Sequence, residues 1–189
     1  DLTFLRNLAT LSWSQDGRRL AQEFLANHGI HLVYVEHLPR THLDGAALQL
    51  ADGTPVIGLT LRHDRLDNFW FCLLHELAHI GRHMSETKNE AFVDDLSLRD
   101  VHAARRDPRE TEADEWAENG LIPEDIWNTS KVKDTPTPLA VMELAQRLGI
   151  HPAIIAGRIR YETRNFRLLS HFVGTGTLRK QFLKKNNDG

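Results

Sequence analysis

The spacing of hydrophobic and polar positions predicts a helix followed by a small sheet in the first third of the chain. Residues 14–27 carry hydrophobic side chains at helical spacing, which predicts an amphipathic helix covering one face of a sheet. Three runs that are typical of strands follow, at 30–35, 45–50 and 55–61. Asp52 and Gly53 lie between the last two runs, and an Asp-Gly pair favours a hairpin turn. We therefore expect a small, mostly antiparallel sheet.

The middle of the chain contains a helix that is hydrophobic on nearly every side. It begins near Asp64 or Asp67 and continues to about Gly81. A helix with this pattern is expected to lie buried at the centre of the fold. Residues 84–108 are polar and acidic without a clear period, so they predict a long loop. Loops of this length in compact domains are often lids or binding segments.

The last third of the chain predicts more helices. Helical patterns at 108–119 and 138–148 each end at a glycine, and a further helix opens at 151–152. Residues 128–138, rich in Lys, Thr and Pro, predict a connector between them.

Together these elements predict an α+β fold in a single domain. Its expected parts are a core containing the sheet and the buried helix at 1–128, a helical C-terminal part of the same domain at 129–183, and a disordered tail at 184–189.

Composition narrows the classes of function. The formal net charge is -3, which gives no general attraction to nucleic acid or to an acidic membrane. Cys72 is the single cysteine, so an internal disulfide and a zinc site built on several thiolates are both excluded. No hydrophobic run approaches the roughly 20 residues of a membrane span, and the first 30 residues lack the pattern of a secretory signal. We expect a cytoplasmic protein without membrane partners.

The buried helix contains the segment His75-Glu76-Leu77-Ala78-His79. Histidines four residues apart project from one face of a helix about one turn apart, so His75 and His79 can bind one metal ion. Glu76 is rotated away from the pair and lies where a general base for an activated water belongs. This pattern predicts a metal-dependent peptidase, with zinc as the expected ion, although manganese, cobalt or nickel also bind such ligands.

A catalytic zinc site needs a third protein ligand, and the segment 109–117 is the expected donor. Glu112 lies one turn before Trp116 and borders the hydrophobic stripe of that helix, so we select it as the third ligand. Glu110 is nearly as suitable by helical angle alone, whereas Glu115 is less suitable. His83 continues the four-residue spacing, but three ligands along one straight helix span too great a length for one tetrahedral ion. We expect His83 to cap the helix end or to support a ligand.

These residues resemble the ImmA/IrrE family of metallopeptidases. The resemblance covers roughly residues 15–165 and depends on five segments: His75-Glu76-Leu77-Ala78-His79, Glu112-Ala113-Asp114-Glu115-Trp116-Ala117, Leu121-Ile122-Pro123, the run 55–65, and Gly149-Ile150-His151-Pro152 leading to Gly157-Arg158. It implies a gluzincin-like core in which His75, His79 and Glu112 bind Zn²⁺ and Glu76 is the general base. One departure is Glu118-Asn119-Gly120, where the family usually has small or apolar residues, and this change is expected to alter the wall near the site.

The resemblance also implies a partner. Members of the family typically lie beside, or are fused to, a helix-turn-helix repressor and relieve repression by cutting such a repressor. The chain is similar to versions fused behind an N-terminal helix-turn-helix domain, some of which are labelled as HigA-type antitoxins. DNA binding would then belong to a domain absent from this chain.

Two functions remain open at this point. The first is a zinc endopeptidase that cleaves a protein partner, with a helix-turn-helix transcriptional repressor as the expected substrate. The second is a non-catalytic zinc-binding regulatory or sensor domain that controls an attached DNA-binding module. Arg158, Tyr161 and His151 are candidates to stabilise an oxyanion, although positions on a helix surface or in a core are commoner for such residues.

Overall fold

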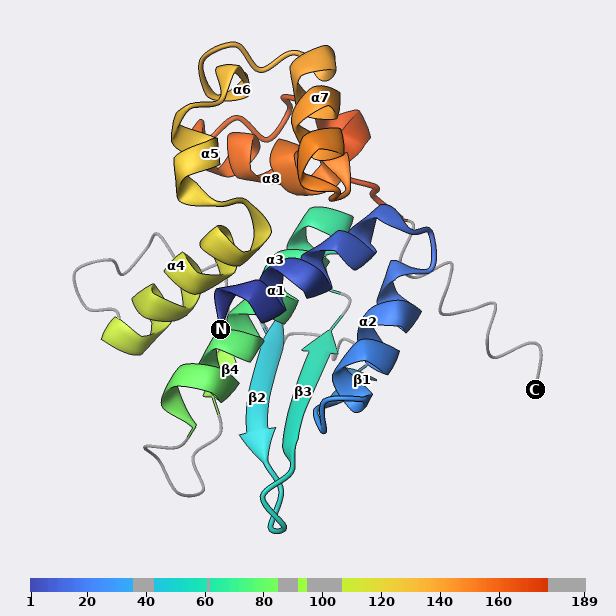
Figure 1. Ribbon diagram of the computed structural model, residues 1–189, viewed down its shortest axis with the longest axis vertical. Coiled ribbons are helices and arrows are strands. Elements are labelled where there is room, and N and C mark those ends of the chain that lie inside the picture. The colour runs from blue at the N-terminus through green and yellow to red at the C-terminus, as the bar shows by residue number, and fades with distance from the viewer. Residues whose placement is uncertain (36–42, 61, 85–91, 95–106, 177–189) are drawn as a thin grey trace.

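The computed structural model describes residues 1–35, 43–60, 62–84, 92–94 and 107–176 (Figure 1). The expected disordered tail at 184–189 lies outside the described residues. Most of the expected loop at 84–108 lies outside them too. The α+β fold class is confirmed: a small sheet occupies the lower half of Figure 1, and the C-terminal helices occupy the upper half.

The sheet has four strands in the order β1-β3-β2-β4. β2 pairs with β3 and with β4 in antiparallel fashion, whereas β1 pairs with β3 in parallel, so the expectation of a mostly antiparallel sheet is confirmed. Gly53 in the β2–β3 hairpin has a φ of 88°, a left-handed conformation that glycine adopts without steric cost. The strands are β1 (His31–Val35), β2 (Gly45–Gln49), β3 (Pro55–Thr60) and β4 (Phe92–Asp94).

β4 corrects the expectation of a continuous loop over 84–108. The strand is three residues long and pairs with the start of β2, with Gly45 opposite Asp94 and Ala47 opposite Phe92. So short a strand inside a polar segment has no alternation long enough to be recognised in the sequence.

The buried central helix is confirmed. α3 (Leu66–Ala78) continues into a π-helical turn, η2 (His79–His83). Every residue of α3 from Cys72 to Ala78 is buried. α3 packs against β2 and β3 of the sheet, and against α4 (Pro108–Leu121) and α8 (Pro152–Glu162). Its central position explains why its sequence is hydrophobic on nearly all sides.

Two N-terminal helices precede the sheet. α2 (Gly17–Ala26) covers β1, as expected for the helix at 14–27: the Gln22 side chain donates to the backbone oxygen of Leu32, and the Tyr34 hydroxyl donates to that of Arg18. α1 (Leu2–Thr10), followed by the short 3₁₀ turn η1 (Leu11–Trp13), was not expected. α1 crosses in front of α3 in Figure 1 and packs against α4.

α4 runs antiparallel to α3. His79 lies beside Glu110, His75 beside Asp114, and Leu74 beside Gly120, so rising numbers on one helix meet falling numbers on the other. The approach at Gly120 is close, because a Cβ added there would lie 2.8 Å from Leu5 Cβ and 3.0 Å from Leu74 Cδ2. The glycine of the departure at 118–120 therefore serves the packing of α1, α3 and α4.

The C-terminal part is helical, as expected. The elements are α5 (Glu124–Asn128), α6 (Lys131–Asp134), α7 (Pro138–Leu148), α8 and the 3₁₀ turn η5 (Ser170–Phe172). The expected connector at 128–138 contains α6, a single turn capped by Ser130. The division of the chain at 128 and 129 stays a prediction. Within the described ranges, no helix combines the length and hydrophobicity needed to cross a membrane.

Candidate metal centre and active site

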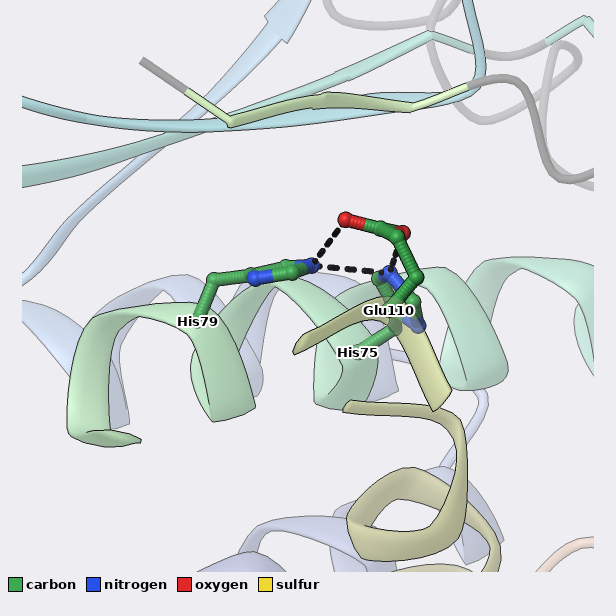
Figure 2. Close-up of side chains that lie close together, drawn as sticks. All are labelled: His75, His79 and Glu110. Carbon is green, nitrogen blue, oxygen red and sulfur yellow. Dashed lines mark hydrogen bonds and ion pairs between the residues drawn. The ribbon is translucent and has the colours of Figure 1, made fainter. Parts of the chain in front are cut away.

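The two histidines of the motif project from the same side of the central helix. His75 belongs to the last turn of α3 and His79 to the first position of η2 (Figure 2). Both residues are 0% exposed, and their Nε2 atoms lie 3.0 Å apart. The four-residue spacing has therefore brought two imidazole nitrogens to a single point, as the sequence predicted.

Glu110 of α4 completes the group. Its Oε2 lies 3.3 Å from His75 Nε2, and its Oε1 lies 3.3 Å from His79 Nε2. Figure 2 shows its carboxylate facing both rings. Ligand atoms of the three residues lie within 4.8 Å of one another. Zinc binds imidazole nitrogen at about 2.0–2.1 Å and carboxylate oxygen at about 2.0–2.2 Å, so one ion can contact all three groups.

The structure corrects the choice of carboxylate. Glu112 does not join the two histidines: its Oε1 accepts from Arg82 Nε at 2.8 Å, and its Oε2 lies 3.1 Å from His83 Nε2. These contacts hold the pKa of the Glu112 carboxyl below its usual value. The hydrogen bond with His83 has the larger effect, and the hydrogen bond with Arg82 the next. The expectation that Glu112 is the carboxylate beside His75 and His79 is wrong in this structure.

The reason lies in which face of α4 is buried. Its fully covered residues are Ala113, Asp114, Ala117, Gly120 and Leu121. Glu110 continues this face by one turn, whereas Glu112 lies about 200° further round the helix. Trp116, which guided the choice of Glu112, is only partly buried and lies under the Arg82 guanidinium, 5.0 Å from its ring centroid. It marks the flank of the buried face and not its centre.

Hydrogen bonds behind the histidines fix their orientation. His75 Nδ1 lies 2.9 Å from Asp114 Oδ1, and a carboxylate partner requires that this nitrogen carry the proton. His75 Nε2 is then a lone-pair donor directed toward Glu110 and His79. A carboxylate behind a ligating histidine is a common arrangement in metal sites, where it fixes the tautomer and raises the basicity of the ring.

A second series of contacts acts on His79 in the same way. His83 Nε2 donates to Glu112, so His83 Nδ1 can accept from His79 Nδ1, 3.0 Å away. His79 Nε2 then also presents a lone pair to the site. Two buried lone pairs 3.0 Å apart beside a carboxylate repel one another unless a cation lies among them. The donor set therefore fits a divalent metal ion, and His83 has the supporting position expected for it.

Glu76 lies beside the metal group, against the sheet. It is 0% exposed, and a Cβ built on Gly45 of β2 would come within 2.1 Å of its Oε1. The first residue of β2 must therefore be glycine for the Glu76 side chain to keep this position. From the neighbouring strand of the same sheet, Phe92 of β4 stacks on His79, with ring centroids 4.5 Å apart and an interplanar angle of 16°.

Comparison with known families agrees with this geometry. The family model of peptidase family M78, described as the IrrE N-terminal-like domain, matches residues 26–160. The chain belongs to this family. The match contains the sheet, α3, α4 and most of α8, and hence every residue of the site described above. No curated protein sequence matches the chain significantly.

Membership in the IrrE-like family confirms the resemblance seen in the sequence. At the level of the family it assigns the chain to the zinc metallopeptidases. The His75, His79 and Glu110 group supplies a candidate metal site in this member. The match does not extend to a helix-turn-helix domain, so the expected fusion stays a prediction.

Several residues of the site were not predicted from the sequence. Asp114 could have been predicted from the sequence, because it lies four residues after Glu110 and therefore on the same face of α4. Gly45 and Phe92 carry none, because their roles depend on how the sheet packs over α3. Among the candidate oxyanion residues, His151 is instead the N-cap of α8, where its Nδ1 accepts from the Ala153 backbone nitrogen.

Zinc affinity distinguishes Glu110 from Glu112. We expect Glu110→Gln to weaken zinc binding by more than about 100-fold, because it removes a ligand charge. Glu112→Gln should cost at most about 10–100-fold, the usual effect of a residue that acts through a ligand. Competition titration with a chromophoric chelator measures both. A larger loss for Glu112→Gln than for Glu110→Gln would contradict the placement of the two carboxylates.

Proposed function

We propose that this member of the IrrE-like family is a zinc-dependent endopeptidase that cleaves a protein substrate. The observation that carries the proposal is the joint arrangement of His75, His79 and Glu110 with Glu76 beside them. Three ligand atoms within 4.8 Å of one another leave a tetrahedral ion one further position. Glu76 directly follows His75 on the same buried helix and is itself 0% exposed, and hydrolysis of a peptide bond requires a carboxylate of this kind as general base.

When bound, zinc supplies a Lewis acid that polarises a peptide carbonyl and lowers the pKa of a water toward about 7. Glu76 takes the proton of the attacking water and then delivers it to the leaving amine. His75 and His79 keep their Nε2 atoms directed at the site, because Asp114 and His83 hold the opposite nitrogens. Gly45 of β2 leaves the space that the Glu76 side chain occupies against the sheet.

The family and the sheet both support a proposal about the substrate class. β4 is one of the two outer strands of the described sheet and carries Phe92 against His79. An extended peptide that pairs with a sheet edge beside the metal would place its backbone across the site. We propose a helix-turn-helix repressor as the substrate, which links the chain to transcription regulation and to toxin-antitoxin control. This substrate implies action in the cytoplasm, where the buried thiol of Cys72 stays reduced.

Replacing the general base tests catalysis directly. Glu76→Gln should retain zinc and lower the cleavage rate by about 10²–10⁴-fold, since the amide cannot accept the proton. The measurement compares zinc content and the cleavage of candidate repressors and of unfolded casein. Zinc retention with equal inactivity of wild type and variant would favour the sensor function over the peptidase.

The glycine at the start of β2 offers a test of how Glu76 is held. Gly45→Ala should displace the Glu76 carboxylate and lower kcat by about 100-fold, the effect of a misplacement near 1 Å. Gly58→Ala is the matched control, because its added Cβ would lie no closer than 3.7 Å to its neighbours. Cleavage rates at saturating zinc are compared. Equal rates for the two variants would show that Gly45 does not position the base.

A further inference from the structure

A cavity of about 340 Å³ opens between α3, the end of α4 and α8. We call it the α3–α8 pocket. Its volume is at the lower end of the range of about 300–1,000 Å³ found for ligand sites. Its hydrophobic wall consists of Phe71, Leu121, Ile122, Ile154, Tyr161 and Phe166.

The pocket continues the faces of the two helices that form the metal group. Phe71 lies one turn before His75 on α3, and their ring centroids are 6.0 Å apart. On α4, Glu118 of the pocket lies one turn beyond Asp114 and two turns beyond Glu110. A third connection runs through the sheet, because Asp44 of the pocket directly precedes Gly45, which contacts Glu76. On α3, on α4 and at the start of β2, residues that line the pocket therefore lie next to residues of the candidate metal site.

The distance between the pocket and the metal site is suited to an extended peptide. One helical turn advances about 5.4 Å along the axis, and residues of an extended chain advance about 3.3 Å each. A peptide whose carbonyl lies at His75, His79 and Glu110 can therefore place a neighbouring side chain near Phe71, one turn away on α3.

The charges that line the pocket balance. Three carboxylates, Asp44, Asp67 and Glu118, face three guanidinium groups, Arg65, Arg158 and Arg164. Several of them pair: Arg65 Nε donates to Asp67 Oδ1 at 2.9 Å, and Arg158 Nη2 lies 3.8 Å from Glu118 Oε2. Burial lowers the pKa of His63, which also lines the pocket, and so favours its neutral form. With no net charge, the lining selects neither an acidic nor a basic side chain.

We propose that the α3–α8 pocket binds a large hydrophobic side chain of the substrate, from the residue that adjoins the cleaved bond. The inference rests on the proposed peptidase function and adds the specificity of the same site. Glu118 sets the charge at the pocket wall. This gives the departure at 118–120 a role in choosing the substrate.

A random peptide library, incubated with the zinc-loaded full chain and read by mass spectrometry, tests the pocket. The wild type should favour Leu, Met or Phe by about tenfold at one position beside the cleaved bond. Glu118→Lys leaves three arginines and a lysine facing two carboxylates, so it should raise the share of Asp and Glu there by about three- to fivefold. Glu115→Lys, an exposed position on the same helix, makes the same charge change outside the pocket and should leave the profile unchanged.

Two results would overturn the inference. One is a wild-type profile indifferent to the side chain at both flanking positions. The other is an unchanged profile in Glu118→Lys while cleavage continues.

Retention of the same library on immobilised, zinc-loaded Glu76→Gln separates the two proposals if the wild type cuts nothing. If the retained peptides are enriched in hydrophobic residues, and the enrichment shifts toward acidic residues when Glu118→Lys is added, the pocket is supported. Only the peptidase proposal then fails. Retention without enrichment overturns the pocket as well.

Discussion

The antiparallel packing of α3 against α4 is the contact on which the site depends. It brings carboxylates of one helix to buried imidazoles of the other: Glu110 to the two Nε2 atoms, and Asp114 to the far side of His75. Imidazoles that are 0% exposed in a hydrophobic helix would otherwise be costly, because buried polar groups need partners. Gly120 permits the close approach of the helices, since a side chain there would meet Leu5 and Leu74. The same packing that stabilises the core therefore brings together the three side chains of the candidate metal site.

Behind the ligands, hydrogen bonds determine which nitrogen of each ring faces the site. Asp114 acts on His75, and Glu112 acts on His79 through His83. Glu110 and Glu112 were nearly equal candidates for the third ligand in the sequence, but they have different positions in the structure. Glu110 faces the two histidine Nε2 atoms, whereas Glu112 contacts His83, which in turn orients His79. Arg82 completes this outer group, with its Nε donating to Glu112 and its guanidinium over Trp116. Glu112 therefore contributes to the site even though it does not face the two Nε2 atoms.

Features that depend on one element alone could be predicted from the sequence. The spacing of His75 and His79 placed both rings on one side of a helix, and the all-round hydrophobicity of that helix predicted its burial. The choice between Glu110 and Glu112 could not be made in this way, because it depends on which face of α4 meets α3. α1 packs on α4 and contributes to that choice, yet α1 itself went unrecognised. Gly45 and β4 were missed for a related reason, since strand pairing across a long segment gives no local periodicity.

The whole proposal depends on His75, His79 and Glu110 binding one divalent cation. Anomalous diffraction from crystals of the zinc-loaded protein tests it most directly. We expect a single zinc atom bonded to Nε2 of both histidines and to a Glu110 oxygen, each at about 2.0–2.2 Å. A zinc atom bonded to Glu112 in place of Glu110, or located away from both histidines, would contradict it.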